Sequence, residues 1–367
     1  MKLFTCTSCG QVLFFENVQC TRCGARLAYL PEHRVVSALE AEKPSDPAEP
    51  SDVAAVFVAL APAAERRCYR LCVNYVQHGV CNWAVPTEHD DALCHACRLT
   101  TTIPDVSNPS AKEAWGRLEI AKRRLLYTLI ELGLPVEPRD ATGNGLAFAF
   151  VESRDGEHVV TGHAGGVITI NVAEADDPFR EAMRRDMGEA YRTLLGHCRH
   201  EIGHYYWDRL VRDTSWLEPF RARFGDERAD YAHARDRHYA SGPPADWATS
   251  HVSAYASMHP WEDWAETFAH YLHMVDTLET ARSYGLALRP APVGGPSLPP
   301  VTARRLGFDD VDDLVTAWVP LTIALNSLNR GMGLPDLYPF VLSDEAVRKL
   351  QLVHDIVDET AGRLRAS

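Results

Sequence analysis

Two histidines and a glutamate lie close together in "RHEIGH", residues 199–204. His200 and His204 are four residues apart, so in a helix they project from one face, one turn apart, and can bind the same metal ion. Glu201 projects beside that ion, where its carboxylate can take a proton from a zinc-activated water. These residue types at this spacing therefore indicate a catalytic zinc site with Glu201 as the general base.

A catalytic zinc site needs a third protein ligand, because such sites normally combine three ligands with one open position. The HExxH string is weak by itself, since a polar stripe on a helix is normally a solvated face. In "HPWEDWAETFAHYLH" Pro260 favours a helix start, and Glu262 and Glu266 then share one face. The helix dipole explains an acidic Glu262 but not Glu266, and Ala265 and Ala269 would let a second helix approach closely. We therefore expect Glu262 to be the third ligand.

The two motifs together resemble known metallopeptidases. His200-Glu201-x-x-His204 followed by Glu262-x-x-Ala265-Glu266 resembles the gluzincins, the group of thermolysin and anthrax lethal factor. With the amino-terminal cysteines, "CNW", "LCHACRLT" and "LNSLNRGMGLPDLYPF", the chain also resembles a bacterial family of zinc-binding metallopeptidases that carry a zinc-ribbon domain. This second resemblance covers most of the chain.

The resemblance implies a role for each residue of the two motifs. His200, His204 and Glu262 would bind zinc, and Glu201 would be the general base. Glu266 would accept a hydrogen bond from the free ring nitrogen of a ligand histidine, for which His200 is preferred, and so fix its tautomer. The implied reaction is hydrolysis of an amide bond in a peptide or protein substrate, with Glu201 returning the proton to the leaving nitrogen.

An oxyanion donor is implied at Tyr255. This residue lies seven positions before Glu262 and matches in spacing the tyrosine that stabilises the oxyanion in lethal-factor-type enzymes. The sequence departs from thermolysin in the long stretch between the ligands and in lacking an obvious matching catalytic histidine. His251 and His259 are nearby, and Tyr255 is preferred over both.

The cysteines predict structural zinc in the first hundred residues. Nine of the ten cysteines lie before residue 100, and Cys6, Cys9, Cys20 and Cys23 form two CxxC pairs, each followed by glycine. Such turns direct four thiolates at one tetrahedral zinc ion, and that ion replaces the core that about 25 residues cannot build. We expect a zinc ribbon here.

A second cysteine cluster offers five thiols for a site that takes four ligands. The preferred ligands are Cys72, Cys81, Cys94 and Cys97, with Cys68 as the spare thiol. Three histidines are alternatives to one of the thiolates: His78, His89 and His95. A cysteine-rich loop without metal is the other alternative.

Composition along the chain predicts a linker, several helices and one small sheet. Residues 37–55, rich in Pro, Ala, Ser and Glu, indicate a solvated linker. The strand patterns "GLAFAFV" and "GVITINVAEA" predict a small antiparallel sheet. Helical periodicity predicts helices at about 110–133, 178–212, 226–240, 260–283, 309–331 and 344–363. The expected fold is α+β and mostly helical: a zinc-ribbon region over 1–104, then a gluzincin-like metallopeptidase domain over 105–367.

Charge and hydropathy limit the partners. A net charge of −13 disfavours nucleic acid, and the chain has neither an apolar amino-terminal run nor a stretch of 18 apolar residues. We therefore expect a cytoplasmic protein that does not bind membranes.

Two functions are compatible with these patterns. The first is a metallopeptidase with one catalytic and two structural zinc ions, whose zinc ribbon recognises a protein partner or the substrate, because four thiolates leave no open position. The second is a non-catalytic zinc-binding scaffold or adaptor that acts through its zinc ribbon.

Overall fold

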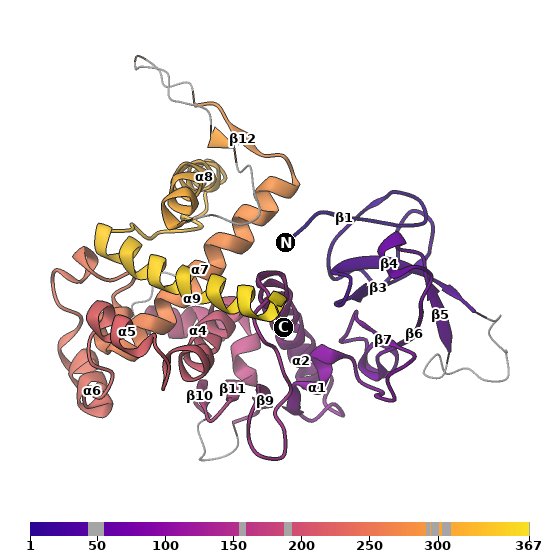
Figure 1. The fold of residues 1–367 in the computed structure, drawn as a ribbon, viewed down its shortest axis with the longest axis horizontal. Coiled ribbons are helices and arrows are strands. Elements are labelled where there is room, and N and C mark those ends of the chain that lie inside the picture. The colour runs from indigo at the N-terminus through magenta and orange to yellow at the C-terminus, as the bar shows by residue number, and fades with distance from the viewer. Residues whose placement is uncertain are drawn as a thin grey trace. The chain divides into compact units, whose positions relative to one another are not determined.

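The computed structural model describes residues 1–42, 55–153, 159–186, 193–290, 294, 301–302 and 310–366 (Figure 1). The chain divides into two compact units. The ribbon unit comprises residues 2–131 and 135–176, and the helical unit comprises Met1, residues 132–134 and residues 177–367. In the described part of the chain, no helix is both long and apolar enough to cross a lipid bilayer.

The ribbon unit begins with a short hairpin and an antiparallel sheet. Strand β1 (Phe4–Thr5) pairs with β2 (Val12–Leu13). A five-stranded sheet follows in sequential order, built from β3 (Arg26–Leu30), β4 (Val35–Ala41), β5 (Val56–Ala59), β6 (Cys68–Leu71) and β7 (Ala84–Pro86). Every neighbouring pair in this sheet is antiparallel. The amino-terminal cysteine-rich β region expected from the sequence is therefore confirmed.

The predicted linker over residues 37–55 is wrong at its amino-terminal end. Residues 37–41 belong to β4, where Ser37 and Ala38 are fully buried. The Ser37 hydroxyl accepts hydrogen bonds from the amides of Leu60 and Ala61, which satisfies a polar side chain inside the sheet. Residues 43–54 of the predicted linker lie outside the described residues. The composition predicted a linker here because serine is typical of loops, and the sequence does not show that Ser37 is buried and hydrogen-bonded.

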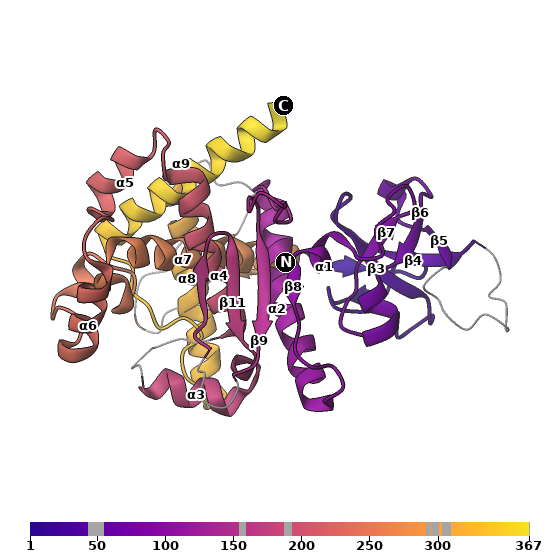
Figure 2. The ribbon, with the colours of Figure 1, turned by 90° about the horizontal axis from the view of Figure 1, so that it is seen from below.

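The second sheet of the ribbon unit is mixed, not antiparallel as predicted (Figure 2). Its order is β10 (Gly162–Ala164), β11 (Val167–Asn171), β9 (Ala147–Val151) and β8 (Thr100–Thr102). Strand β9 pairs in parallel with both β8 and β11, and only β10 and β11 are antiparallel. The "HAGG" turn joins β10 to β11 and not β9 to β11. The four buried residues 147–150 fit a central parallel strand, which is covered on both faces.

One long helix packs on this sheet. Helix α2 (Pro109–Leu132) places Lys122 over the rings of Phe148 and Phe150 in β9, and Glu119 within 2.9 Å of the Lys122 amine. The short α1 (His95–Arg98) precedes it. The unit also contains 3-10 turns at Pro62–Ala64 and Val172–Ala175 and a π-turn at Asn74–His78.

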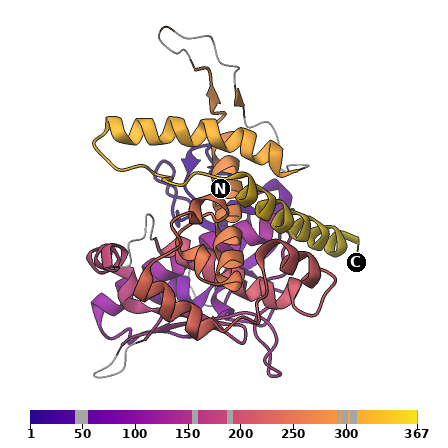
Figure 3. The same ribbon diagram turned by 90° about the vertical axis from the view of Figure 1, so that its left-hand side faces the viewer.

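The helical unit is built around α7, which packs against α4, α8 and α9 (Figure 3). Its helices are α3 (Asp177–Asp186), α4 (Leu194–Tyr206), α5 (Leu217–Phe224), α6 (Tyr231–Ser241), α7 (Pro260–Ser283), α8 (Val311–Gly331) and α9 (Asp344–Ala366). Short strands β12 (Ala287–Leu288) and β13 (Val301–Thr302) pair with each other. A π-turn at Trp207–Val211 and 3-10 turns at Trp247–Thr249 and Tyr255–Met258 complete the unit. Helices and small sheets together confirm the α+β class.

Most predicted helices are confirmed, but the predicted helix over 178–212 is wrong. Thr193 is extended, with φ −131° and ψ 157°, and its hydroxyl accepts a hydrogen bond from the Gly196 amide. Thr193 is therefore the N-cap of α4, and α3 is a separate helix. The apolar periodicity of the sequence continues on both sides of Thr193, so it did not reveal that a helix begins there. Residues 187–192 lie outside the described residues.

Candidate functional site

The HExxH residues and the predicted third ligand meet at one point in the helical unit. The Nε2 atoms of His200 and His204, both on α4, are 3.2 Å apart. The Oε2 atom of Glu262, in the first turn of α7, lies 3.0 Å from His200 Nε2 and 3.4 Å from His204 Nε2. Ligands about 2.0–2.1 Å from zinc in a tetrahedron are about 3.3 Å from one another. This triangle of two nitrogens and one oxygen therefore fits a zinc ion with an open fourth position.

A glycine inside the motif allows the two helices to approach so closely. A Cβ atom at Gly203 would lie 2.9 Å from the Ala265 Cα atom and 3.3 Å from the Phe268 Cβ atom. The indole nitrogen of Trp264 donates a hydrogen bond of 2.9 Å to the Gly203 carbonyl. The close approach predicted from the small residue Ala265 is confirmed, and it brings the candidate ligands of α4 and α7 together.

Glu266 fixes the orientation of His200. The Nδ1 atom of His200 lies 2.7 Å from Glu266 Oε1, and the Ser253 hydroxyl donates to Glu266 Oε2 at 2.5 Å. Burial opposes ionisation of Glu266, but the hydrogen bond with His200, the charges of His200 and His270 and the hydrogen bond from Ser253 together outweigh it and lower the Glu266 pKa to about 2. With Glu266 ionised, the proton between the two groups resides on His200 Nδ1, so Nε2 is the ring atom directed at the other two candidate ligand atoms.

Glu201 is a buried carboxylate beside this triangle. Its side chain is 8% exposed, and among the described residues it accepts no hydrogen bond. Burial raises the pKa of Glu201 above its ordinary value, although the two ligand histidines oppose the shift. A carboxylate with a raised pKa holds a transferred proton better than an exposed one does, as a general base must.

Tyr255 lies beside the ligands, at the start of the 3-10 turn Tyr255–Met258. Its ring centroid is 6.0 Å from that of His200. Burial, followed by the charge of Glu262, raises the Tyr255 pKa well above its usual range, so the hydroxyl keeps its proton at neutral pH. The site thus has a protonated hydroxyl that can donate to an oxyanion.

The two histidines near Tyr255 contact other groups. His259 is the N-cap of α7: its Nδ1 atom accepts from the Trp261 amide, and its Nε2 atom lies 3.0 Å from the Ala229 carbonyl oxygen. His251 contacts the Ser250 hydroxyl and the Trp247 carbonyl through Nδ1. In the described part of the chain, neither ring contacts the three candidate ligand atoms.

Tyr231 belongs to the site and was missed by sequence reasoning. It is the first residue of α6, and its hydroxyl donates a 2.8 Å hydrogen bond to Glu262 Oε1. Trp261 was also missed, and its ring lies 3.8 Å from that of His204. No signal in the sequence pointed to Tyr231, because 31 residues separate it from Glu262 and no helical or strand spacing connects them.

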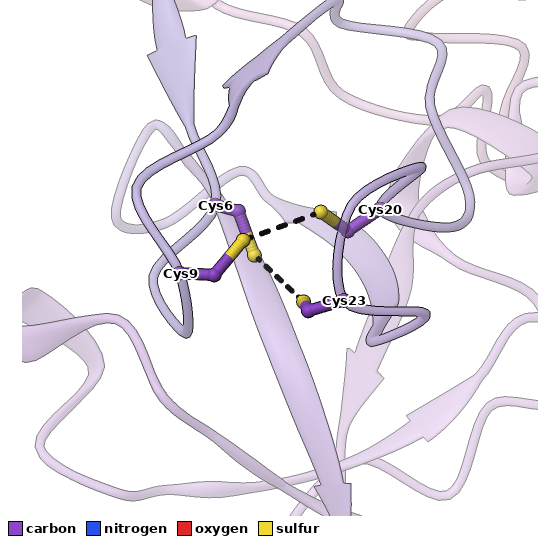
Figure 4. Close-up of side chains that lie close together, drawn as sticks. All are labelled: Cys6, Cys9, Cys20 and Cys23. Carbon is purple, nitrogen blue, oxygen red and sulfur yellow. Dashed lines mark hydrogen bonds between the residues drawn. The ribbon is translucent and has the colours of Figure 1, made fainter.

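The first cysteine group comes together as predicted. The Sγ atoms of Cys6 and Cys23 are 3.8 Å apart, those of Cys9 and Cys20 are 3.6 Å apart, and all four lie within 4.8 Å of one another (Figure 4). The glycine after each CxxC pair has a positive φ, 75° and 72°, which the tight turns require. This group could hold one tetrahedral metal ion.

The second cysteine group contains the four preferred thiols. Cys72, Cys81, Cys94 and Cys97 are buried, with Sγ atoms within 4.8 Å of one another. Cys68 lies in β6, outside this group. Backbone amides point at the sulfurs, since Cys94 donates to Cys72 Sγ at 3.3 Å. Such amide contacts are typical of thiolates that bind metal.

Comparison with known proteins identifies one family and one domain in this chain. Residues 111–356 match the family described as "Putative zinc-binding metallo-peptidase", and residues 3–108 match a zinc-ribbon domain. The chain is 43% identical over 363 residues to uncharacterized protein Rv2568c of Mycobacterium tuberculosis, across 98% of this chain and 96% of the relative. Uncharacterized protein Mb2598c of Mycobacterium bovis shows the same identity and coverage. No solved structure matches the chain. The chain therefore belongs to the zinc-binding metallo-peptidase family and carries an amino-terminal zinc-ribbon domain.

Proposed function

We propose that this protein is a zinc-dependent peptidase of the gluzincin type that hydrolyses amide bonds in peptides or proteins. One observation carries most weight: His200, His204 and Glu262 aim three ligand atoms at one point, and the carboxylate of Glu201 is buried beside it without a hydrogen-bond partner in the described residues. A purely structural site would be closed by a fourth protein ligand and would need no free carboxylate.

The residues around the ligands have complementary roles in this reaction. When bound, zinc would lower the pKa of a coordinated water to about 7 and polarise the substrate carbonyl. Glu201 takes the proton from the attacking water and delivers it to the leaving nitrogen, so that the elements of water are added across the amide bond. Tyr255 donates a hydrogen bond to the oxyanion, and Glu266 holds the tautomer of His200.

The zinc ribbon has a different role in this proposal. Its four thiolates would saturate a zinc ion, so the ribbon does no chemistry and instead recognises a protein partner or the substrate. The cellular compartment proposed for this activity is the cytoplasm, where reduced thiols stay available to zinc.

The decisive experiment replaces the proposed base without touching the ligands. Glu201→Gln should keep the metal content of the wild type and reduce hydrolysis of a peptide library by at least about 100-fold, because general-base catalysis contributes about 10²–10⁴-fold. Metal content by mass spectrometry and product formation by liquid chromatography would be measured on the same samples. Glu218→Gln, at an 81% exposed side chain on α5, is the matched control and should behave like the wild type.

Two outcomes would contradict the proposal. Turnover that persists in Glu201→Gln would exclude Glu201 as the base. A zinc content that does not fall by one ion in His204→Ala, with no hydrolysis by the wild type, would instead favour the non-catalytic adaptor that acts through the zinc ribbon.

A further inference from the structure

The carboxylate of Glu262 has two oxygens, and only one of them faces the ligand histidines. Oε2 lies 3.0 Å and 3.4 Å from the two Nε2 atoms, whereas Oε1 accepts the 2.8 Å hydrogen bond from the Tyr231 hydroxyl. Glu262 is 2% exposed, so bulk water does not compete for Oε1. Tyr231 therefore determines which part of the Glu262 carboxylate is free to bind a metal.

This choice matters because a carboxylate can bind a metal through one oxygen or through both. A second oxygen at the metal would occupy the open position that a catalytic site must keep for water or substrate. The hydrogen bond from Tyr231 to Oε1 opposes two-oxygen binding, because Oε1 would have to leave the Tyr231 hydroxyl to reach the metal. The hydroxyl of Tyr231 is thus placed to keep Glu262 monodentate.

Several contacts hold Tyr231 in this position. Asp230 caps α6 by accepting from the His233 amide at 3.0 Å, which fixes where the helix begins. His259, the N-cap of α7, reaches the Ala229 carbonyl oxygen at 3.0 Å, and its ring packs edge-on against that of Tyr231 at 5.3 Å. The start of α6 is therefore fastened directly to the start of α7, where Glu262 lies.

We propose that Tyr231 is a positioning residue that keeps Glu262 a one-oxygen ligand and so preserves the open coordination position. This inference rests on the metal ligands of the proposed function, but it does not depend on catalysis. Tyr231 acts through Glu262 and differs in this from Tyr255, which is proposed to contact the reacting atoms.

The test removes only the hydroxyl, by Tyr231→Phe, and measures the properties of a bound metal ion instead of activity. Cobalt(II) would replace the metal at the histidine site, and its affinity and visible absorption would be measured on the full chain. Identically treated His204→Ala protein supplies the baseline from the thiolate sites. Four-coordinate cobalt absorbs several-fold more strongly than five-coordinate cobalt, so the variant should lose absorbance as Glu262 becomes bidentate. Its cobalt affinity should change by about 10–100-fold, as expected when an outer partner of a ligand is lost.

The controls separate this inference from the proposed function. Tyr284→Phe, at a 51% exposed tyrosine just beyond α7, should leave both affinity and spectrum unchanged. A Tyr231→Phe variant with the affinity and spectrum of the wild type would overturn the positioning role, whatever its activity. If wild-type protein took up no more cobalt than His204→Ala, the metal site of the proposed function would itself be wrong.

Discussion

The thiolate groups and the histidine–glutamate site are two ways of bringing candidate metal ligands together in one chain. Cys6, Cys9, Cys20 and Cys23 come from 18 consecutive residues of the ribbon unit and offer only sulfur. The histidine–glutamate site takes its candidate ligands from two packed helices, with Glu262 58 positions after His204. In the first arrangement metal substitutes for a core, whereas in the second a core positions the ligands. At the thiolate groups we therefore expect stability to depend on the metal. At the histidine–glutamate site we expect reactivity, and not stability, to depend on it.

Losing a thiolate should have the largest effect. Cys81→Ser would leave the buried second group with three thiols, and structural zinc contributes about 10–16 kcal/mol in zinc-finger peptides. We expect loss of one zinc ion, rapid proteolysis within the ribbon unit and a lower far-UV signal from strands. His204→Ala should lose one zinc ion as well, yet keep its helical signal, because packing holds α4 against α7.

Cys68→Ser is the matched control, since Cys68 lies in β6 outside the group. It should retain all zinc and resist protease like the wild type. Unfolding of Cys68→Ser with full folding of a Cys72→Ser variant would mean that the structure assigns the wrong thiol to the second group.

A smaller effect is expected from a buried ion pair behind the histidine–glutamate site. Lys349 on α9 lies 2.6 Å from Asp263 on α7, and both side chains are at most 4% exposed. Burial raises the pKa of Asp263 to about 7, although Lys349 opposes the shift. Lys349→Met leaves that acid buried without its cation, and breaking a buried pair from one side costs about 3–5 kcal/mol.

Chemical denaturation followed by fluorescence would measure this loss. Arg348→Met, at a 58% exposed neighbour, should change stability by less than about 0.5 kcal/mol. An equally small change in Lys349→Met would show that the helical core does not depend on the pair. Core packing alone would then suffice to position Glu262.

The difference between the two kinds of site also explains how much could be predicted from sequence. The first thiolate group and His200 with His204 were predictable because CxxC pairs and a four-residue helical spacing mark them, whereas the second group left five thiols for four positions. Glu262 could be found because a helix start and a four-residue spacing marked it. Tyr231 could not, since its hydrogen bond to Glu262 depends on how α6 meets α7. The mixed sheet was missed for the same reason, because alternation along β9 does not reveal its neighbours.

The smallest expected effect is on the pH dependence of stability. It tests whether buried histidines of the helical unit are neutral in the folded protein. Burial lowers the pKa of His270 to about 4, with Glu266 opposing and Arg199 assisting. Because the unfolded pKa is about 6.5, the unfolded chain binds the proton first, so stability falls as pH drops from about 6.5 to about 4. His270 alone should account for up to about 2 kcal/mol at pH 5.

His270→Gln removes this titration but also the 2.7 Å contact with the Tyr338 hydroxyl, so the measurement is the pH dependence and not the stability at pH 7. Unfolding free energies between pH 7 and pH 5 should decline less steeply in His270→Gln than in the wild type. Protonation of the candidate metal ligands occurs in both proteins, and Glu266, whose pKa the charge of His270 lowers, is the group near them whose titration differs. His233→Gln, at an exposed residue of α6, should keep the slope of the wild type. Identical slopes in all three proteins would mean that His270 is protonated alike in the folded and unfolded chains, and that acid acts on this unit through its metal ligands instead.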